Sequence, residues 1–503
     1  MMTMKKIFFA LSTLAILLSS CGKDFITVKH NSSEPLDEYF INQERMYQSL
    51  VAAYDPLQWL DYWDQYVNAL TLTPDIMADD IYCGGSNEGD QPILVKTHYF
   101  TLTPTDQSDR IWTICYSGIN RACVVLEHVD AVPGMDEQTK MLYKAEATVL
   151  KAFYYNLLWK FWGNVPYYDK NLESPYFADQ FTADEVYAKN VANLEQVFEW
   201  DVLPMKANAG EEGRVTLAMA YMLYTEMVMY QNDADRYATA LGYMKEIIDS
   251  THYDLVGDFA SIWLESGEWG AESIWEINYT SEGAARSWGS PMTAGGTVYP
   301  MLIGIPGATE ASGFCDGWGF GPVAKHAYEM YEDGDQRRDG GILFYNNIYD
   351  PIPEEKMRWQ GTGYYLLKYV ARRSGTHGQI ADADMNHCNN IRVYRFAETL
   401  LNAAELAVLT GADGSQYLQR VRQRAGCTAS GTDQASIIEE RRKEFLGEGK
   451  RYWDLVRSGL AQDVLKGENH EWRTEDWHPG KKHWPLPQSE VDKDPNLVQN
   501  VGY

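Results

Sequence analysis

The stretch 438–459 constrains the fold of this chain more than any other part of its sequence. Glu439 and Lys443 stand four residues apart with the acid first, which is the favourable order for an ion pair along a helix. Gly447 and Gly449 permit a positive φ, so one helix can end there and another can begin after a tight turn. The pattern therefore predicts two helices that meet at an elbow.

The second of these helices has an amphipathic pattern. Trp453, Val456 and Leu460 recur at helical spacing and give the helix one apolar face. Asp454 and Arg457 are three residues apart and are placed to form an ion pair. We therefore predict a buried, ion-paired helical corner that holds no ligand.

Three motifs carry a resemblance to a known family. The stretch 438–459 closely resembles the motif that marks the C-terminal part of the SusD/RagB family, the surface glycan-binding lipoproteins of Bacteroidetes-type bacteria. The segments 484–490 (WPLPQSE) and 496–503 (NLVQNVGY) resemble the way such chains end, and 145–167 resembles part of the family's N-terminal half. The matches stand in the family's order and span most of the chain.

Helical periodicity dominates the rest of the sequence. The longest helical pattern covers 137–162, and Thr182 is a suitable N-cap for a further helix that ends at residue 200. Two pairs of helices, 215–249 and 394–425, resemble tetratricopeptide hairpins, in which small residues let the two helices approach. With the family resemblance, these patterns predict a mostly α fold: a tetratricopeptide-like, SusD-like scaffold of helical hairpins with long irregular loops and a few short strands.

The other predicted elements are shorter. Helices are expected over 37–54, 59–72 and 111–129, and Pro74 is expected to follow the end of the second one. The segment 272–279 alternates in polarity like a short strand.

The N-terminus has the pattern of a bacterial lipoprotein signal. Two lysines precede an apolar run over 7–18, which is too short to span a bilayer as a mature helix. Cys21 follows small residues, as in a lipobox, which implies cleavage before Cys21, thioether lipidation of its sulfur, and N-acylation by a fatty acid such as palmitate. Several acyl chains would anchor the protein stably to a membrane. The alternative is an ordinary secretory signal with an incidental cysteine.

These features divide the chain into four parts. The expected parts are a lipoprotein signal peptide over 1–20, a tether over 21–36, a SusD-like N-terminal helical part over 37–260, and a RagB/SusD C-terminal part over 261–503.

Charge and motif content limit the function classes. The net charge of the 503 residues is −28, so a nucleic acid would be repelled and is not expected as a partner. The sequence has no phosphate loop, no nucleophile elbow, and no zinc-protease or calcium-loop motif. Its seven cysteines show no zinc spacing. We therefore predict no catalytic residue, no metal site and no cofactor.

Aromatic residues in irregular segments are the candidate ligand contacts. The chain has 16 Trp and 34 Tyr, many of them beside Gly, Asn and Asp, and the segment 280–322 has no helical period. Loops of this length in a compact protein are usually functional or disordered, and disordered segments are poor in aromatic residues. A flat ring matches the apolar face of a sugar, and polar neighbours match its hydroxyl groups. The predicted ligand-binding residues are therefore Tyr82, Trp288, Tyr299 and Trp318.

The resemblance implies a non-catalytic lipoprotein on the cell-surface side of the outer membrane. It would bind a glycan or oligosaccharide and deliver it to a SusC-like TonB-dependent transporter. Two other classes stay open. A helical glycoside hydrolase or polysaccharide lyase would need a deep cleft with two carboxyl groups at catalytic separation. A scaffold for protein partners would use only the tetratricopeptide-like groove.

Overall fold

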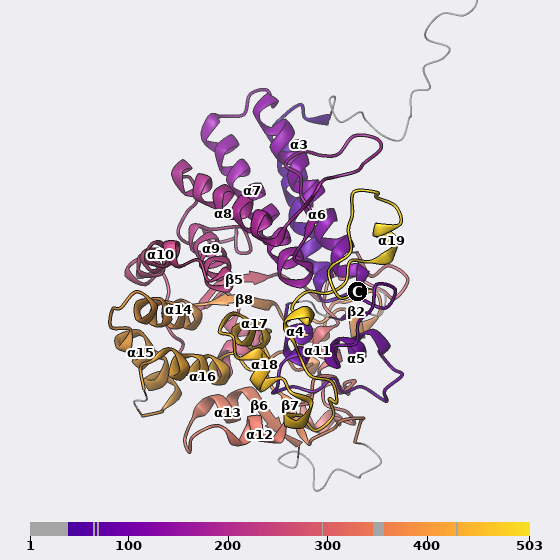
Figure 1. The fold of residues 1–503 in the computed structure, drawn as a ribbon, viewed down its shortest axis with the longest axis vertical. Coiled ribbons are helices and arrows are strands. Elements are labelled where there is room, and N and C mark those ends of the chain that lie inside the picture. The colour runs from indigo at the N-terminus through magenta and orange to yellow at the C-terminus, as the bar shows by residue number, and fades with distance from the viewer. Residues whose placement is uncertain (1–38, 64–65, 68–69, 294, 346–356, 429–430) are drawn as a thin grey trace, which may run out of the picture.

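The computed structural model describes residues 39–63, 66–67, 70–293, 295–345, 357–428 and 431–503 (Figure 1). The predicted signal peptide, the tether and the predicted lipid attachment site Cys21 lie outside these residues.

The first helix whose bounds the structure describes is α3 (Gln43–Tyr54). It starts later than predicted because the side chain of Asn42 caps it at Arg45 N, 3.0 Å away. The helix predicted over 59–72 is wrong. A 3₁₀-helix (Asp55–Leu60) covers the start of this segment, and β1 (Tyr62–Trp63) pairs antiparallel with β2 (Tyr66–Val67) after it. The helix α4 (Leu72–Met77) contains Pro74 instead of ending before it. Pro74 is tolerated because the first N–H groups of a helix have no intrahelical acceptor.

Three long helices form the upper part of the molecule in Figure 1: α6 (Asp109–His128), α7 (Glu137–Trp162) and α8 (Ala183–Trp200). Their predicted spans are confirmed to within two residues, and Thr182 caps α8 in a reciprocal capping box with Glu185. The helices α6 and α7 cross closely at Gly118, where a Cβ atom would lie 2.2 Å from the ring of Tyr154. Only glycine leaves room for that ring.

Two helical hairpins follow these three helices. They are α9 (Leu217–Gln231) with α10 (Tyr237–Asp249), and α14 (Phe396–Leu409) with α15 (Ser415–Ala425). The helix α10 packs against α14, so the second hairpin stacks on the first although about 150 residues separate them in the sequence (Figure 1). The strand β5 (Ser273–Ile277) joins the same two regions by pairing antiparallel with β8 (Ile391–Arg395). The mostly α, tetratricopeptide-like prediction is confirmed.

The remaining α-helices and strands of the described residues have at most eleven residues each. They are α5 (Pro92–His98), β3 (Val165–Pro166), β4 (Gln180–Phe181), α11 (Tyr299–Leu302), α12 (Lys325–Glu329), α13 (Gln336–Gly341), β6 (Ile342–Phe344), β7 (Tyr364–Leu366), α16 (Gln434–Glu444), α17 (Arg451–Arg457), α18 (Ala461–Val464) and α19 (Gln488–Val491). The segment 280–322 is irregular, as expected, apart from α11 and one 3₁₀ turn (Glu310–Ser312).

The predicted corner is formed by α16 and α17. Gly447 and Gly449 have φ of +79° and +72°, and a Cβ atom on Gly449 would lie 1.9 Å from the carbonyl oxygen of Leu70. Asp454 pairs with Arg457 at 2.7 Å, as predicted.

The predicted ion pair between Glu439 and Lys443 is wrong, because each side chain pairs with another residue. Glu439 lies 3.4 Å from Arg442, and Lys443 reaches Glu332 at 3.6 Å. The helix turns the two side chains toward different neighbours, so spacing along the helix did not decide the pairing.

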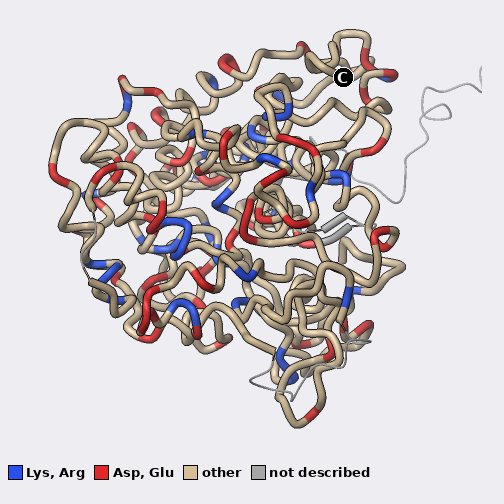
Figure 2. Tube along the Cα trace, turned by 60° about the horizontal axis from the view of Figure 1, so that its bottom comes forward, with Lys and Arg blue, Asp and Glu red and all other residues tan. Residues whose placement is uncertain are grey.

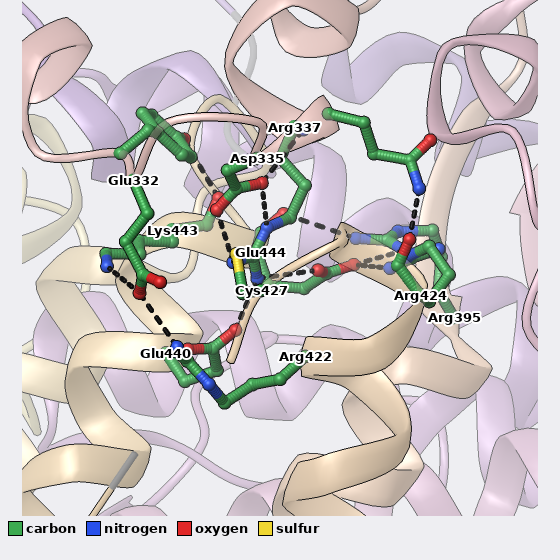
Figure 3. Close-up of polar contacts among 12 residues, drawn as sticks. Glu332, Asp335, Arg337, Arg395, Arg422, Arg424, Cys427, Glu440, Lys443 and Glu444 are labelled. Atoms are coloured by element: carbon green, nitrogen blue, oxygen red, sulfur yellow. Dashed lines mark hydrogen bonds and ion pairs between the residues drawn. The ribbon is translucent and has the colours of Figure 1, made fainter. Parts of the chain in front are cut away.

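Glu444, at the end of α16, lies at the centre of buried ion pairs (Figure 3). Its carboxylate accepts hydrogen bonds from Arg424, from Arg395 at 3.2 Å and from Arg337 at 3.3 Å. Burial alone would raise the pKa of Glu444, but the three guanidinium groups hold it well below its usual range. Further buried pairs join Arg337 to Asp335 and Glu440, Arg422 to Glu440, and Lys368 and Arg395 to Glu448.

Along the described part of the trace, acidic and basic positions are interspersed (Figure 2). Every helix in the described part of the chain is too short or too polar to cross a bilayer. The six cysteines that the structure describes are free thiols.

Candidate functional site

Two of the predicted ligand contacts meet on the surface. The indoles of Trp288 and Trp318 are 30 positions apart in the sequence, yet their ring centroids lie 5.7 Å apart with an interplanar angle of 29°. Trp288 is 46% exposed, and Trp318 is half-buried against the core. The stack therefore has a half-buried inner ring that supports an outer ring facing solvent.

A buried ion pair fixes the loop that carries Trp288. Arg286, two residues earlier, donates from both terminal nitrogens to the carboxylate of Asp61, each at 2.7 Å. The same carboxylate accepts from the hydroxyl of Thr297 at 2.8 Å and from Val298 N at 3.0 Å. All these groups are buried. Both ends of the loop are therefore tied to one point of the N-terminal part of the molecule.

The side-chain amide of Asn386 forms a second clamp on this loop. Its nitrogen donates to the carbonyl oxygens of Arg286 and Asp382, each at 2.7 Å, and its oxygen accepts from Gly296 N at 3.3 Å. A Cβ atom on Gly296 would lie 2.2 Å from the Cα of Asn386, so only glycine permits this approach. The loop is held by side chains from distant segments rather than by regular secondary structure.

Trp318 is held by backbone pairing between two glycine-containing segments. Trp318 N donates to Met301 O at 2.9 Å, and Gly317 N donates to Ile305 O at 2.9 Å. A Cβ atom on Gly317 would lie 2.2 Å from the backbone of Gly304. The two segments can pack this closely because neither glycine carries a side chain.

Three carboxylates lie near the indole pair. Trp288 N donates to Asp382 at 3.0 Å, and Asp316, next but one to Trp318 along the chain, accepts from Gly307 N at 2.5 Å. Burial, and then the negative charges of Asp382 and Asp316, raise the pKa of Asp384. Carboxyl groups suited to the hydroxyl groups of a sugar therefore lie beside the backbone that carries the two rings.

The structure removes Tyr299 from the set of ligand contacts. Tyr299 is fully buried at the start of α11, and its ring lies 5.7 Å from that of Tyr369. Burial raises the pKa of its hydroxyl well above the usual value. Its position in an irregular segment suggested exposure, but α11 turns the side chain into the core, where no ligand can reach the ring.

Tyr82 is also buried, with 3% of its surface exposed. Its ring lies edge-on to His470 at 5.0 Å, and its hydroxyl donates to Glu471 at 3.3 Å. It therefore packs against residues 470 and 471, next to Trp472 in the sequence, and offers a ligand little ring surface.

The same segment supplies an aromatic pair that the sequence analysis missed. The rings of Trp359 and Trp472 lie 6.3 Å apart at 58°, and Trp472 is 37% exposed. More than a hundred positions separate them in the sequence. Both stand among Gly, Asn, Gln or charged residues without helical period, so the criterion that selected Trp288 could have selected them too.

Backbone contacts connect the two aromatic pairs. Trp359 N donates to Gly85 O at 3.1 Å, and Gly85 N donates to Gly319 O at 3.2 Å, directly after Trp318. A Cβ atom on Gly319 would also lie 3.0 Å from the side chain of Arg358. The backbone segments that carry Trp318 and Trp359 are therefore neighbours, joined through Gly85. We call the four indoles of the two pairs, Trp288, Trp318, Trp359 and Trp472, the indole face.

Comparison with known proteins gives the chain its family. A model described as the SusD family matches residues 271–503, and a model described as starch-binding associating with outer membrane matches residues 25–208. A solved structure of surface glycan-binding protein A from Bacteroides thetaiotaomicron, in complex with laminarihexaose, is 43% identical with a TM-score of 0.87 and covers 91% of this chain and 99% of that one.

Two further solved structures are similar over the same length. Surface glycan-binding protein A from Bacteroides uniformis is 40% identical with a TM-score of 0.83, covering 91% of this chain and 99% of that one. A laminarin binding SusD-like protein is 27% identical with a TM-score of 0.81, covering 92% of this chain and 100% of that one. With two family models on its two halves and relatives of this similarity over nearly its whole length, the chain belongs to the SusD family.

Proposed function

We propose that this protein captures an oligosaccharide of the laminarin type on the indole face and holds it without cleaving it. The observation that carries the proposal is the stacked pair of Trp288 and Trp318, half exposed and fixed by buried clamps. The 43%-identical relative solved with laminarihexaose supports the choice of ligand class.

The geometry suits recognition through stacking and hydrogen bonds. The exposed indole of Trp288 can cover the C–H face of one sugar ring, which removes apolar surface of both groups from water. Asp316, Asp382 and Asp384 can accept hydrogen bonds from hydroxyl groups at the rim. Because Arg286 and Asn386 already hold the loop, binding need not order it, which reduces the entropy cost.

The second pair suggests that the ligand is a chain of several sugars. Trp359 and Trp472 continue the indole face beyond Gly319, and their planes are tilted by 58° rather than parallel. A curved polysaccharide could contact both pairs, and the contacts would add because one chain joins them. Affinity should therefore rise with chain length until both pairs are covered.

One observation favours hydrolysis as a second candidate function. Asp384 has a raised pKa beside Asp382 and Asp316, and a glycosidase likewise needs a protonated and an ionised carboxyl group. We propose binding alone because the relatives are named for binding and the indole pair is exposed rather than set in a deep cleft.

We further propose an outer-membrane location. Cleavage before Cys21 and lipidation of its sulfur would tether the mature chain, and the N-terminal family model is described as associating with the outer membrane. By the resemblance of its motifs, the protein would pass its ligand to a SusC-like TonB-dependent transporter.

Isothermal titration of the soluble form, lacking residues 1–21, against a panel of oligosaccharides tests the proposal. We expect laminarihexaose to bind and the paired substitutions Trp288→Ala and Trp318→Ala to lower its affinity at least tenfold. Tyr47→Ala, which removes an aromatic ring 42% exposed elsewhere on the molecule, is the matched control and should change nothing.

Chromatography of the incubated sugars tests the enzymatic alternative in the same samples. Unchanged oligosaccharide after long incubation supports binding alone. Shortened products that disappear in Asp384→Asn would overturn the non-catalytic proposal.

A further inference from the structure

A separate groove lies between α6, the loop 172–178 and the C-terminal segment around α19. Its volume is about 750 Å³, against about 200 Å³ for a cavity beside α3 and about 30 Å³ for two others. In Figure 1, α19 lies to the right of α6. None of the residues that line the groove belongs to the indole face. The groove is within the usual size range of a small-ligand site, about 300–1,000 Å³.

Two adjacent aromatic side chains line this groove and face solvent. Tyr176 is 69% exposed and Phe177 is 42% exposed. Tyr176 also has a φ of +65°, a left-handed conformation that is rare for a bulky residue and costs on the order of 1–3 kcal/mol. The chain thus keeps a strained backbone and two exposed rings at one point, which folding alone does not favour.

The inner wall of the groove is a rigid aromatic layer. Trp112 contacts Tyr116 at 4.9 Å between ring centroids, and Tyr116 stacks with Tyr168 at 6.1 Å and 24°. The hydroxyl of Tyr116 donates to Pro166 O at 2.7 Å, and burial raises its pKa well above the usual value. These rings are fixed before any ligand arrives, so their ordering adds no cost to binding.

The outer rim is polar and carries both charges. Glu490 and Lys493 pair at 2.8 Å on the exposed side. Asp494 accepts from Ala178 N at 3.3 Å, which ties the C-terminal segment to the loop that carries Tyr176 and Phe177. A rim with carboxylates and one ammonium group offers hydrogen-bond donors and acceptors to an uncharged ligand. The net charge of −28 disfavours a polyanion.

We propose that this groove is a second carbohydrate-binding site, which takes a neutral oligosaccharide between the exposed rings of Tyr176 and Phe177 and the polar rim. The inference rests on the proposed function of the indole face but uses none of its residues. Flat rings with hydroxyl-matching groups around a concave volume are the chemistry of sugar recognition. A polysaccharide that reached both sites would be retained more tightly than either site alone allows.

Titration of the soluble chain with laminarihexaose, and affinity electrophoresis with polymeric laminarin, test the inference. Four proteins are compared: the parent, the paired variant Trp288→Ala with Trp318→Ala, the paired variant Tyr176→Ala with Phe177→Ala, and the combination of all four substitutions. Tyr176 and Phe177 are exposed, so their replacement should leave the melting temperature within a few degrees, which a thermal scan checks.

We expect two hexasaccharides per parent chain, one per chain in each paired variant, and none in the combination. Affinity for the polymer should fall at least tenfold when either site is lost. Tyr176→Phe, which keeps the ring, should bind like the parent.

Two results would overturn the inference in distinguishable ways. If the Tyr176 and Phe177 pair leaves every isotherm unchanged while the tryptophan pair abolishes binding, the groove is not a sugar site and the proposed function stands. If the parent binds no glycan of the panel, the proposed function fails and the groove inference falls with it.

Discussion

The ionic corner of residues 438–459 and the irregular segment 280–322 solve opposite problems. The corner buries charge: Glu444 and two partners from other segments, Arg337 and Arg395, are almost inaccessible to water. The irregular segment does the reverse and leaves the large apolar ring of Trp288 in solvent. Buried charges can be stable only when all partners are present, whereas an exposed ring contributes little to folding. The corner therefore serves the fold, and the indole face is free to serve a ligand.

The largest loss of stability is expected on removing the carboxylate at the centre of the corner. Glu444→Ala leaves Arg337, Arg395 and Arg424 without a shared partner, and loss of one partner in a buried pair costs about 3–5 kcal/mol. We expect the free energy of unfolding, measured with urea, to fall by that amount. The matched control is Glu439→Ala, whose side chain is 54% exposed and which should cost at most about 1 kcal/mol. Equal losses in the two variants would show that the corner is no more than surface charge.

Acid should dismantle the corner and its neighbouring buried pairs next. Burial alone would raise the pKa of Asp454, but Arg441 and Arg457 hold it at about 2, and Lys160 similarly holds the pKa of Glu226 at about 2. A carboxyl group with a lowered folded pKa stabilises the protein above its unfolded pKa, and this stability is lost as pH falls.

The expected window therefore runs from about pH 4.5 down to about 2, with on the order of 2 kcal/mol lost per group. Burial raises the pKa of Asp75, which works in the opposite direction and offsets part of the loss. Urea titrations at half-unit intervals of pH provide the measurement. Stability that stays constant between pH 5 and 3 would contradict it.

The corner could be predicted because its signals are local. The turn glycines and the pairing of Asp454 with Arg457 follow from spacing within one short stretch. Its remaining partners could not be predicted, because Glu444 meets Arg337 and Arg395 from segments far away in the sequence. Spacing along the helix also predicted the wrong ion-pair partner for Glu439, which lies near Arg442 and Arg451.

The indole face could be predicted only in part, for the same reason. Composition selected Trp288 and Trp318, but it could not show that they stack or that Tyr299 is buried. Those facts depend on α11 and on clamps from Asp61 and Asn386, which no local pattern reveals. An irregular segment has no period, so the sequence does not indicate which side chains turn inward.

A substitution at Asn386, which clamps the loop that carries Trp288, should weaken sugar binding without disturbing the fold. Asn386→Ala removes hydrogen bonds to Arg286, Asp382 and Gly296, and loosens the loop that presents Trp288. We expect affinity for laminarihexaose to fall about tenfold, which corresponds to about 1.4 kcal/mol, while the circular dichroism spectrum is unchanged. Asn208→Ala, an exposed amide that bonds only locally to Glu211, is the control and should bind normally. Unchanged affinity in Asn386→Ala would mean that the loop needs no clamp.

The smallest effects are expected when a buried aromatic residue, Tyr299, and an exposed one, Trp288, are each replaced by phenylalanine. Tyr299→Phe keeps the ring inside the core and removes only a hydroxyl group that no ligand can reach, since Tyr299 is fully buried. We expect the free energy of unfolding to change by less than about 1 kcal/mol and sugar affinity not to change at all. Trp288→Phe at the surface should show the reverse, with weaker binding and unchanged stability, because a smaller ring covers less of a sugar. Calorimetry and urea unfolding on both proteins provide the test. A loss of sugar affinity in Tyr299→Phe would mean that α11 moves during binding. The clamps would then not keep the irregular segment rigid.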